Sequence, residues 1–206
     1  MIVDNFDLFK KIINPLNDDE FYFVQILIRG KDGHTEPGVN GNNKNRLIKF
    51  YTIKSAEHLA RVEDEIKAIC NVVNSRAYIH PTKRSFKAVG KECLRVTTEM
   101  FLCENNTGLK GAYSTACGKS YITADKKFIV DLDGENASHE KAIEINNYIT
   151  QECEPLNQNK YCYRVYTAHG MHLITTPFNT AKFSKQFPNI DIHKNNPTLL
   201  YFNCLE

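Results

Sequence analysis

The chain has 206 residues, 42% of them hydrophobic and 24% charged, and a formal net charge of +2 at pH 7. These values are typical of a globular protein with one sizeable core, and the near-neutral charge argues against a protein that binds polyanions over its whole surface. The seven cysteines are odd in number and form no Cys-x-x-Cys pair, so they predict a reducing compartment rather than a zinc site or a disulfide framework. Without a signal peptide or a membrane-spanning apolar run, we expect a soluble, cytoplasmic protein with no membrane partner.

The first 120 residues are predicted to form an α/β module. Helical spacing of apolar residues, β-branched runs and glycine-rich stretches define its elements. In chain order these are a helix at about 6–16, a strand at 21–28, a loop at 29–45, a strand at 46–53, a helix beginning after Ser55 and reaching 73, a short strand at 77–80, a helix at about 89–103 and a loop at 105–120. The strands at 21–28 and 46–53 are expected to pair as a hairpin.

The segment from Phe128 to Gly134 (FIVDLDG) is an apolar strand that ends in two carboxylates. Because side chains alternate along a strand, Asp131 and Asp133 share one face, opposite the apolar residues Phe128, Val130 and Leu132. Two carboxylates fixed on a strand edge suit a divalent cation, which prefers oxygen ligands. The same acids could instead solvate the end of the strand and begin an Asp-Gly turn.

The C-terminal half, residues 121–206, is predicted to be a β-α-β-β-α-β module. A helix at about 138–152 follows the acidic strand, and strands at 161–166 and 171–175 flank a tight link at 168–170. A short helix at about 180–187 and a strand at 198–202 complete the order. This order is that of a ferredoxin-like or RNA-recognition-like sheet with helices on one face. The overall expectation is an α/β (α+β) chain in which this module packs against the N-terminal one.

Three short motifs occur in order in this half. The acidic pair Asp131/Asp133 comes first, Thr167 and the Gly170-Met171-His172 step follow, and Asp191 stands between two isoleucines. This combination resembles the archaeo-eukaryotic primase superfamily, which includes primase-polymerases. Members carry a strand ending in two acids, a motif with serine, glycine and histidine, and a later hydrophobic-Asp motif. Thr167 stands where that family has serine.

The resemblance implies a single catalytic domain with DNA primase or polymerase activity on a single-stranded template. Asp131, Asp133 and Asp191 would be the catalytic residues and would hold two Mg²⁺ or Mn²⁺ ions, which neutralise the triphosphate and activate the 3′ hydroxyl. Its partners would be a nucleoside triphosphate, single-stranded DNA or a primer-template, and a helicase or other replication protein.

The resemblance also implies a nucleotide-binding set. His172 and Thr167 would hydrogen-bond phosphate oxygens, and His169 belongs to the same segment. By composition alone, Lys194 and Arg84 (or Lys83) would add positive charge.

Two other functions fit parts of the pattern. The chain could be a non-catalytic nucleotide- or nucleic-acid-binding module of the same fold, in which exposed aromatics such as Tyr161, Tyr163 and Phe202 stack on bases. The segment from Val130 to Gly134 also resembles the first motif of haloacid-dehalogenase-type phosphatases. That alternative requires a later lysine and an acidic pair on further parallel strands.

Overall fold

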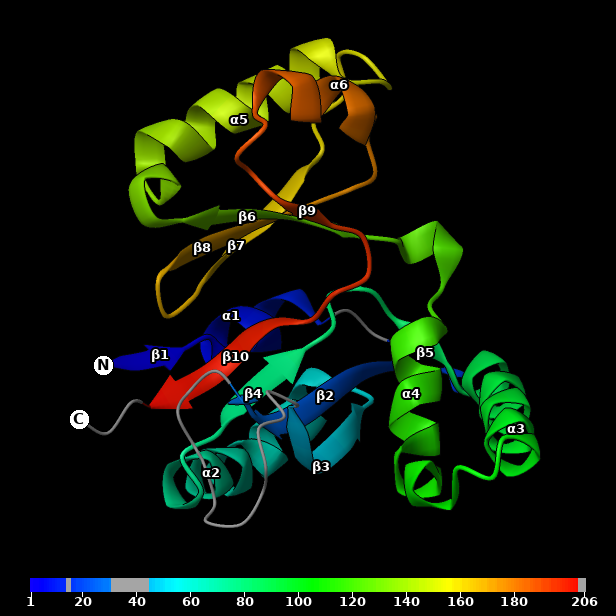
Figure 1. Ribbon diagram of the computed structural model, residues 1–206. Helices are drawn as coiled ribbons and strands as arrows, with labels where there is room; N and C mark the ends of the chain where they lie inside the picture. Colours follow the sequence, from blue (N-terminus) through cyan, green and yellow to red (C-terminus); the bar gives the residue numbers. More distant parts are fainter. Residues whose placement is uncertain (14–15, 31–44, 204–206) are drawn as a thin grey trace.

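The computed structural model describes residues 1–13, 16–30 and 45–203. These residues form two antiparallel sheets with helices packed against them (Figure 1). The predicted α+β fold class is therefore confirmed. In the described ranges, every helix is too short or too polar to cross a membrane.

The first sheet contains strands from both ends of the chain. Its order is β1-β10-β4-β2-β3, and β5 pairs with β2 at one end. The strands span Ile2–Asp4 (β1), Glu20–Ile28 (β2), Arg46–Ile53 (β3), Arg76–Ile79 (β4), Arg84–Ser85 (β5) and Thr198–Asn203 (β10). The predicted hairpin of β2 and β3 is confirmed by their antiparallel register. Most of the loop predicted at 29–45 lies outside the described residues.

Helices α1 (Phe6–Ile12) and α2 (Ala56–Val72) pack on the main core of this sheet. The predicted N-cap of α2 is confirmed, because the Ser55 side chain accepts a hydrogen bond from the backbone N–H of His58. Helix α1 ends at Ile12, earlier than the predicted 16. Strand β1, which precedes α1, was not predicted from the sequence.

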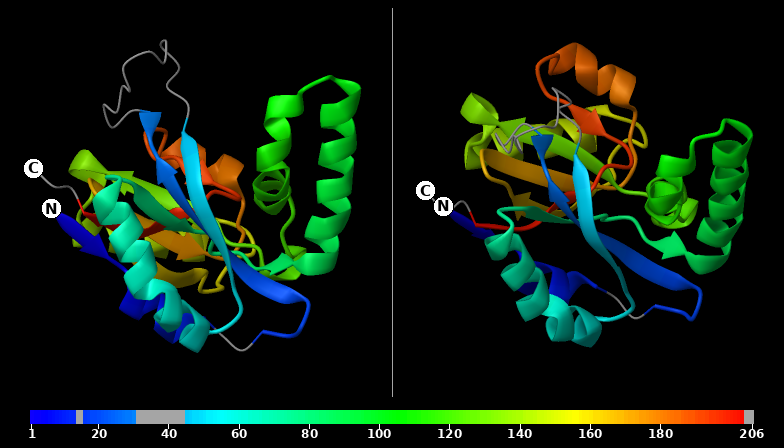
Figure 2. Two further views of the ribbon diagram at one scale, coloured as in Figure 1. Left: turned by 90° about the horizontal axis from the view of Figure 1, so that it is seen from below. Right: turned by 60° about the horizontal axis from the view of Figure 1, so that its bottom comes forward.

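Helices α3 (Phe86–Leu102) and α4 (Ala112–Lys119) lie together beside the sheets, as Figure 2 shows. A loop had been predicted at 105–120, and this prediction is wrong, because a 3₁₀ segment (η2, Asn106–Gly111) leads into α4. The physical reason is tertiary: Ala116 and Cys117 of α4 are buried against Phe21 and Phe23 of β2. This burial outweighs the low helix propensity of a glycine-containing segment.

The second sheet has the order β7-β8-β6-β9. Its strands span Phe128–Asp133 (β6), Tyr161–Tyr166 (β7), Gly170–Thr175 (β8) and Ile192–His193 (β9). Short 3₁₀ segments flank β6 at Thr123–Asp125 (η3) and Gly134–Asn136 (η4). Since β8 is antiparallel to both β6 and β7, those two strands are parallel with β8 between them, which is the split β-α-β arrangement.

The order β-α-β-β-α-β is thus present, but its last strand differs from the prediction. The expected strand at 198–202 is β10, and it lies between β1 and β4 of the first sheet. The two-residue strand β9 takes the fourth place in the second sheet. Strand β10 is buried on both faces, and only the interior of the larger sheet provides that burial. The chain therefore does not separate into two sheets at residue 120.

Helices α5 (His139–Glu152) and α6 (Thr180–Gln186) cover one face of the second sheet. On β6, this face carries the apolar residues Phe128, Val130 and Leu132. Ile129 points the other way, into the core shared with α1 and α2. Asp131 and Asp133 alternate with the apolar set, so they share the face of Ile129 and look toward the first sheet.

Candidate functional site

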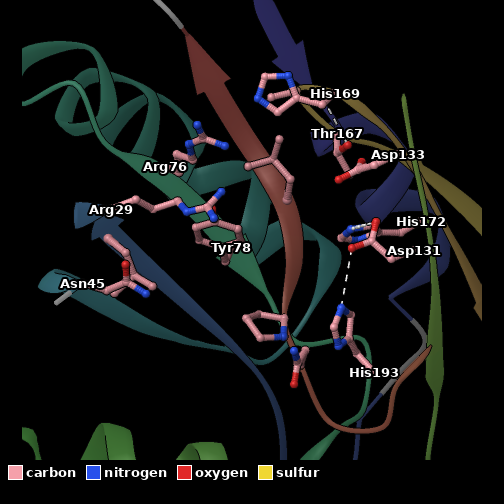
Figure 3. A pocket seen from close by; sticks show the side chains of 15 residues that line it. Arg29, Asn45, Arg76, Tyr78, Asp131, Asp133, Thr167, His169, His172 and His193 are labelled. Carbon is pink, nitrogen blue, oxygen red and sulfur yellow. Dashed lines mark hydrogen bonds and ion pairs between the residues drawn. The ribbon is translucent and has the colours of Figure 1, made fainter. Parts of the chain in front are cut away.

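A pocket of about 300 Å³ lies between the two sheets (Figure 3). The first sheet contributes a basic wall, with Arg29 after the end of β2, Arg76 and Tyr78 on β4, and Asn45 just before β3. The floor is formed by β10 and the residues that precede it, including Pro197 and Leu199. The two arginine side chains therefore lie on the same side of the pocket.

The second sheet contributes an acidic, imidazole-rich wall. Asp131 and Asp133 come from β6, His172 from β8 and His193 from β9, and the turn at 167–169 closes the rim. Figure 3 shows this wall across β10 from Arg29 and Arg76. Carboxylates and guanidinium groups thus face each other across one pocket.

The pairing of β6 with β8 fixes the positions of Asp131 and Asp133 relative to the Gly-x-His motif of β8. Asp131 lies directly opposite His172, and Asp133 lies opposite Gly170. A Cβ atom on Gly170 would come within 2.0 Å of the carbonyl oxygen of Leu132 and 2.9 Å of Oδ1 of Asp133. Only glycine permits this close approach. Gly170 therefore allows Asp133 to lie directly beside β8.

The carboxylate of Asp131 lies between two histidines. Its Oδ1 is 3.3 Å from Nε2 of His172, and its Oδ2 is 3.5 Å from Nε2 of His193. Partial burial by itself raises the pKa of Asp131, but the attraction of the two imidazoles outweighs it and holds the pKa well below the usual range. Asp131 is therefore ionised at neutral pH.

One oxygen of Asp131 remains unsatisfied. Oδ1 is buried and has no hydrogen-bond partner among the described residues, since the contact with His172 lacks hydrogen-bond geometry. A buried carboxylate oxygen without a partner is costly, and a cation in the pocket would satisfy it.

His172 is oriented by the other sheet. Its Nδ1 lies 2.7 Å from the hydroxyl oxygen of Thr198, which is fully buried on β10. The negative charge of Asp131 favours a proton on Nε2, so Nδ1 accepts the hydrogen bond that the Thr198 hydroxyl donates. The imidazole is thus held between the two sheets.

His193 is the second imidazole beside Asp131. Its side chain is partly exposed, and its contact with Asp131 raises its pKa, with a smaller contribution from Asp191. The histidine therefore carries more positive charge near neutral pH than a free one would.

Five of the eight predicted site residues line this pocket: Asp131, Asp133, Thr167, His169 and His172. Asp191 lies outside the lining and is exposed, although its carbonyl oxygen accepts a hydrogen bond from the N–H of Asp131 at 3.0 Å. It is a backbone neighbour of the site at the edge of the sheet.

Lys194 is not brought to the pocket. Since His193 pairs with Ile129 on β6, the next side chain points to the opposite face of the sheet. Its Nζ lies 5.8 Å from the ring centroid of Phe128, in the region of α5 and α6. The nucleotide-binding role predicted for Lys194 is not supported by this position.

Arg84 is also placed elsewhere, because it is fully buried beneath the first sheet. Its guanidinium donates hydrogen bonds to the carbonyl oxygens of Cys117 and Thr82, to Nδ1 of His80 and to Oδ1 of Asn195. The alternative cation, Lys83, forms an ion pair with Glu20 at 3.2 Å. Neither residue lines the pocket, so the prediction from composition is corrected: Arg84 links β5, α4 and the loop before β10.

Sequence reasoning missed Arg29, Arg76, His193 and Thr198. Arg29, Arg76 and Thr198 lie at strands or strand ends with no motif around them, and the two sheets meet only through tertiary packing. His193 had one signal, since it follows the hydrophobic-Asp motif at Asp191 by two residues. Arg76 had a weak signal, since it begins a stretch with an excess of basic residues, and Arg29 had none.

The donor chemistry of the pocket fits a hard divalent cation. Carboxylate oxygens are the ligands that Mg²⁺ and Mn²⁺ prefer, and Oδ1 of Asp131 accepts no hydrogen bond from the described residues. Within the described ranges, no group of three or more histidine, cysteine or acidic side chains is placed to enclose a metal ion. Mg²⁺ is commonly held by one or two carboxylates together with substrate phosphates. The residues therefore fit an ion that enters with a phosphorylated ligand.

Comparisons with protein-family models, curated proteins and solved structures find no match for this chain.

Proposed function

We propose that this protein is a metal-dependent nucleotidyltransferase of the primase-polymerase kind, which adds nucleotides on a single-stranded DNA template. One observation carries the proposal: Asp131 and Asp133 face Arg29 and Arg76 across a single pocket. A nucleoside triphosphate bound with a divalent cation needs both kinds of charge at once. The motif order from Asp131 to His172, together with their direct opposition in the β6–β8 ladder, adds support.

Each side chain has a role in this proposal. Asp131 and Asp133 hold the metal ions, and Arg29 and Arg76 bind phosphate oxygens from the opposite wall. His172, held by Thr198, presents its Nε2–H beside Asp131 and donates to a phosphate oxygen. When bound, Mg²⁺ or Mn²⁺ would neutralise phosphate charge and lower the pKa of the attacking 3′ hydroxyl.

The test is incorporation of labelled nucleotides on single-stranded DNA, with and without a primer, in Mg²⁺ or Mn²⁺. We expect products from the wild type and none from Asp131→Ala or Asp133→Ala. Glu135→Ala is the matched control, since it removes an exposed carboxylate two residues from Asp133 that does not line the pocket. Wild-type protein that makes no product, or an Asp131→Ala variant that retains full activity, would contradict the proposal. The primer-free reaction separates a primase from an enzyme that only extends.

A second candidate is a nucleotide- or nucleic-acid-binding module without turnover. It is favoured by the position of Asp191 outside the pocket lining and by the two histidine side chains that already contact the Asp131 carboxylate. Nucleotide binding that persists in EDTA and in Asp131→Ala, without incorporation, would support this candidate.

The phosphatase alternative lacks its required framework. It needs parallel strands beside the first acidic motif, whereas β6 is antiparallel to both of its neighbours, β8 and β9.

A further inference from the structure

A second pocket, of about 250 Å³, lies on the opposite face of the second sheet, between α5 and the edge strand β7. Helix α5 contributes His139, Ile143 and Asn146, and β7 contributes Tyr161 and Arg164. None of the residues described above as lining the first pocket takes part in it. We call it the α5–β7 pocket.

The α5–β7 pocket has a cationic end. Nη1 of Arg164 is 3.0 Å from Nδ1 of His139, which must accept this hydrogen bond because arginine only donates. The guanidinium also lies 5.1 Å from the ring centroid of Tyr166. The lining, as described, contains no aspartate or glutamate, and no carboxylate of the described residues forms an ion pair with Arg164. The position of this cation is therefore fixed while its charge is not neutralised.

Apart from Asn146, the rest of the pocket lining is largely apolar. Leu173 of β8 lies at its base, and the side chains of Tyr161 and Ile143 are 39% and 49% exposed at its sides. A planar ligand in the pocket would cover this exposed apolar surface. Asn146 adds an amide that donates and accepts hydrogen bonds in one plane.

We propose that the α5–β7 pocket binds a nucleobase together with its 5′ phosphate. Tyr161 stacks on the base, Asn146 pairs with the base edge, and Arg164 binds the phosphate. The volume of about 250 Å³ is small for a ligand pocket, so it limits the ligand to one nucleotide unit. An apolar or aromatic peptide side chain would leave Arg164, His139 and Asn146 without partners, so the chemistry favours a nucleotide.

The two pockets are adjacent through β8. His172 points into the first pocket and Leu173, the next residue, lies at the base of the second. The ligand of the α5–β7 pocket can come from either of two sources, a free mononucleotide or an unstacked base of a single strand. The inference does not rest on the proposed transferase activity, since none of its groups contacts a metal ligand.

The experiment measures equilibrium binding in EDTA with two probes, AMP by calorimetry and a fluorescein-labelled oligodeoxyadenylate by fluorescence anisotropy. We expect Tyr161→Ala and Arg164→Gln each to weaken binding about 10-fold. Tyr161→Phe, which keeps the ring, is expected to bind as the wild type does. Arg95→Gln, which changes an exposed arginine on α3, is the matched control for lost positive charge. All variants alter partly exposed side chains, and an unchanged unfolding midpoint verifies their fold.

The two probes distinguish the sources of the ligand. Weakening of AMP binding identifies a free mononucleotide, and weakening of oligonucleotide binding alone identifies a single strand. The proposal is overturned if the wild type binds neither probe, or if Tyr161→Ala and Arg164→Gln leave binding unchanged. Because EDTA removes the metal ions, a failure of nucleotide incorporation does not affect this result.

Discussion

Two clusters in this protein place a charged side chain beside histidine, and their surroundings differ. Arg84 is fully buried and donates hydrogen bonds to four acceptors, one of them on His80. Burial lowers the pKa of Arg84 to about 10, so it remains charged. Asp131, beside His172 and His193, lines a pocket and keeps a buried oxygen without a hydrogen bond.

The difference separates a structural charge from a functional one. A buried ion whose donors all have partners has nothing left to offer a ligand, and its role is to hold elements together. An ionised carboxylate with an unsatisfied oxygen, next to a cavity, is poised to bind a cation. Both residues were candidates from the sequence, and only their partners distinguish them.

The largest expected effect comes from breaking the buried cluster. Arg84→Met removes four hydrogen bonds, three of them buried, and we expect a loss of about 3–5 kcal/mol in the free energy of unfolding. Urea denaturation measures this. The matched variant Arg95→Met removes an exposed arginine paired with Glu92 and Glu99, and it should leave the urea midpoint nearly unchanged, because exposed ion pairs contribute little to stability. Equal losses in the two variants would contradict the structural role of Arg84.

A smaller loss is expected from Gly170→Ala beside the open cluster. The new Cβ would clash with the backbone of Leu132, so β6 and β8 must separate, at a cost of about 1–3 kcal/mol. Nucleotide incorporation should fall as well, because Asp133 moves. Gly90→Ala is the control: no atom lies within 4 Å of its Cβ position on α3, and it should raise stability by about 0.5–1 kcal/mol. Undiminished stability in Gly170→Ala would show that the register is wrong.

The buried cluster also predicts a pH dependence of stability. Burial, and then the charge of Arg84, hold the pKa of His80 well below its ordinary value of 6.5. As pH falls below 6.5, His80 becomes protonated in the unfolded chain but stays neutral in the folded protein. The free energy of unfolding therefore falls by up to about 1.4 kcal/mol per pH unit. Urea midpoints between pH 7.5 and 5.5 measure this slope.

The control is His80→Gln, whose amide can accept from Arg84 and donate to the Asn195 carbonyl without titrating. The slope should be shallower in this variant than in the wild type, and all other groups titrate equally in both. If the two slopes are the same, His80 is not the titrating group.

The smallest effect is expected at Thr198, which joins the open cluster to the first sheet. Thr198→Val removes the hydrogen bond to Nδ1 of His172, and we expect a loss of about 1 kcal/mol. The side chain of His172 should also become less well positioned. We therefore expect the KM for nucleotide to rise, while the unfolding midpoint falls only slightly. Thr175→Val is the control, since its buried hydroxyl has no partner among the described residues, and the change should be neutral or stabilising. A stable Thr198→Val with an unchanged KM would remove Thr198 from the site.

Several parts of the fold could be predicted because their causes are local. The helix cap at Ser55, the spacing of apolar residues in α2 and α5, and the β-branched and aromatic runs of β2 and β3 each depend on residues close together in the sequence. Helix α4 could not be predicted, because burial against distant phenylalanines, rather than its own sequence, stabilises it. The position of β10 could not be predicted either, because β10 pairs with β1 and β4, which lie far away in the sequence.

By itself, the sequence determined that Asp131 and Asp133 share one face of a strand, since side chains alternate there, and that a glycine and His172 follow in a fixed order. Only the tertiary structure decided which face of the first sheet they meet. It brought Arg29 and Arg76 to the pocket, buried Arg84 and turned Lys194 away. These outcomes depend on how two sheets pack and on which sheet gains the last strand. Both are set by burial summed over residues far apart in the chain, which no local pattern records.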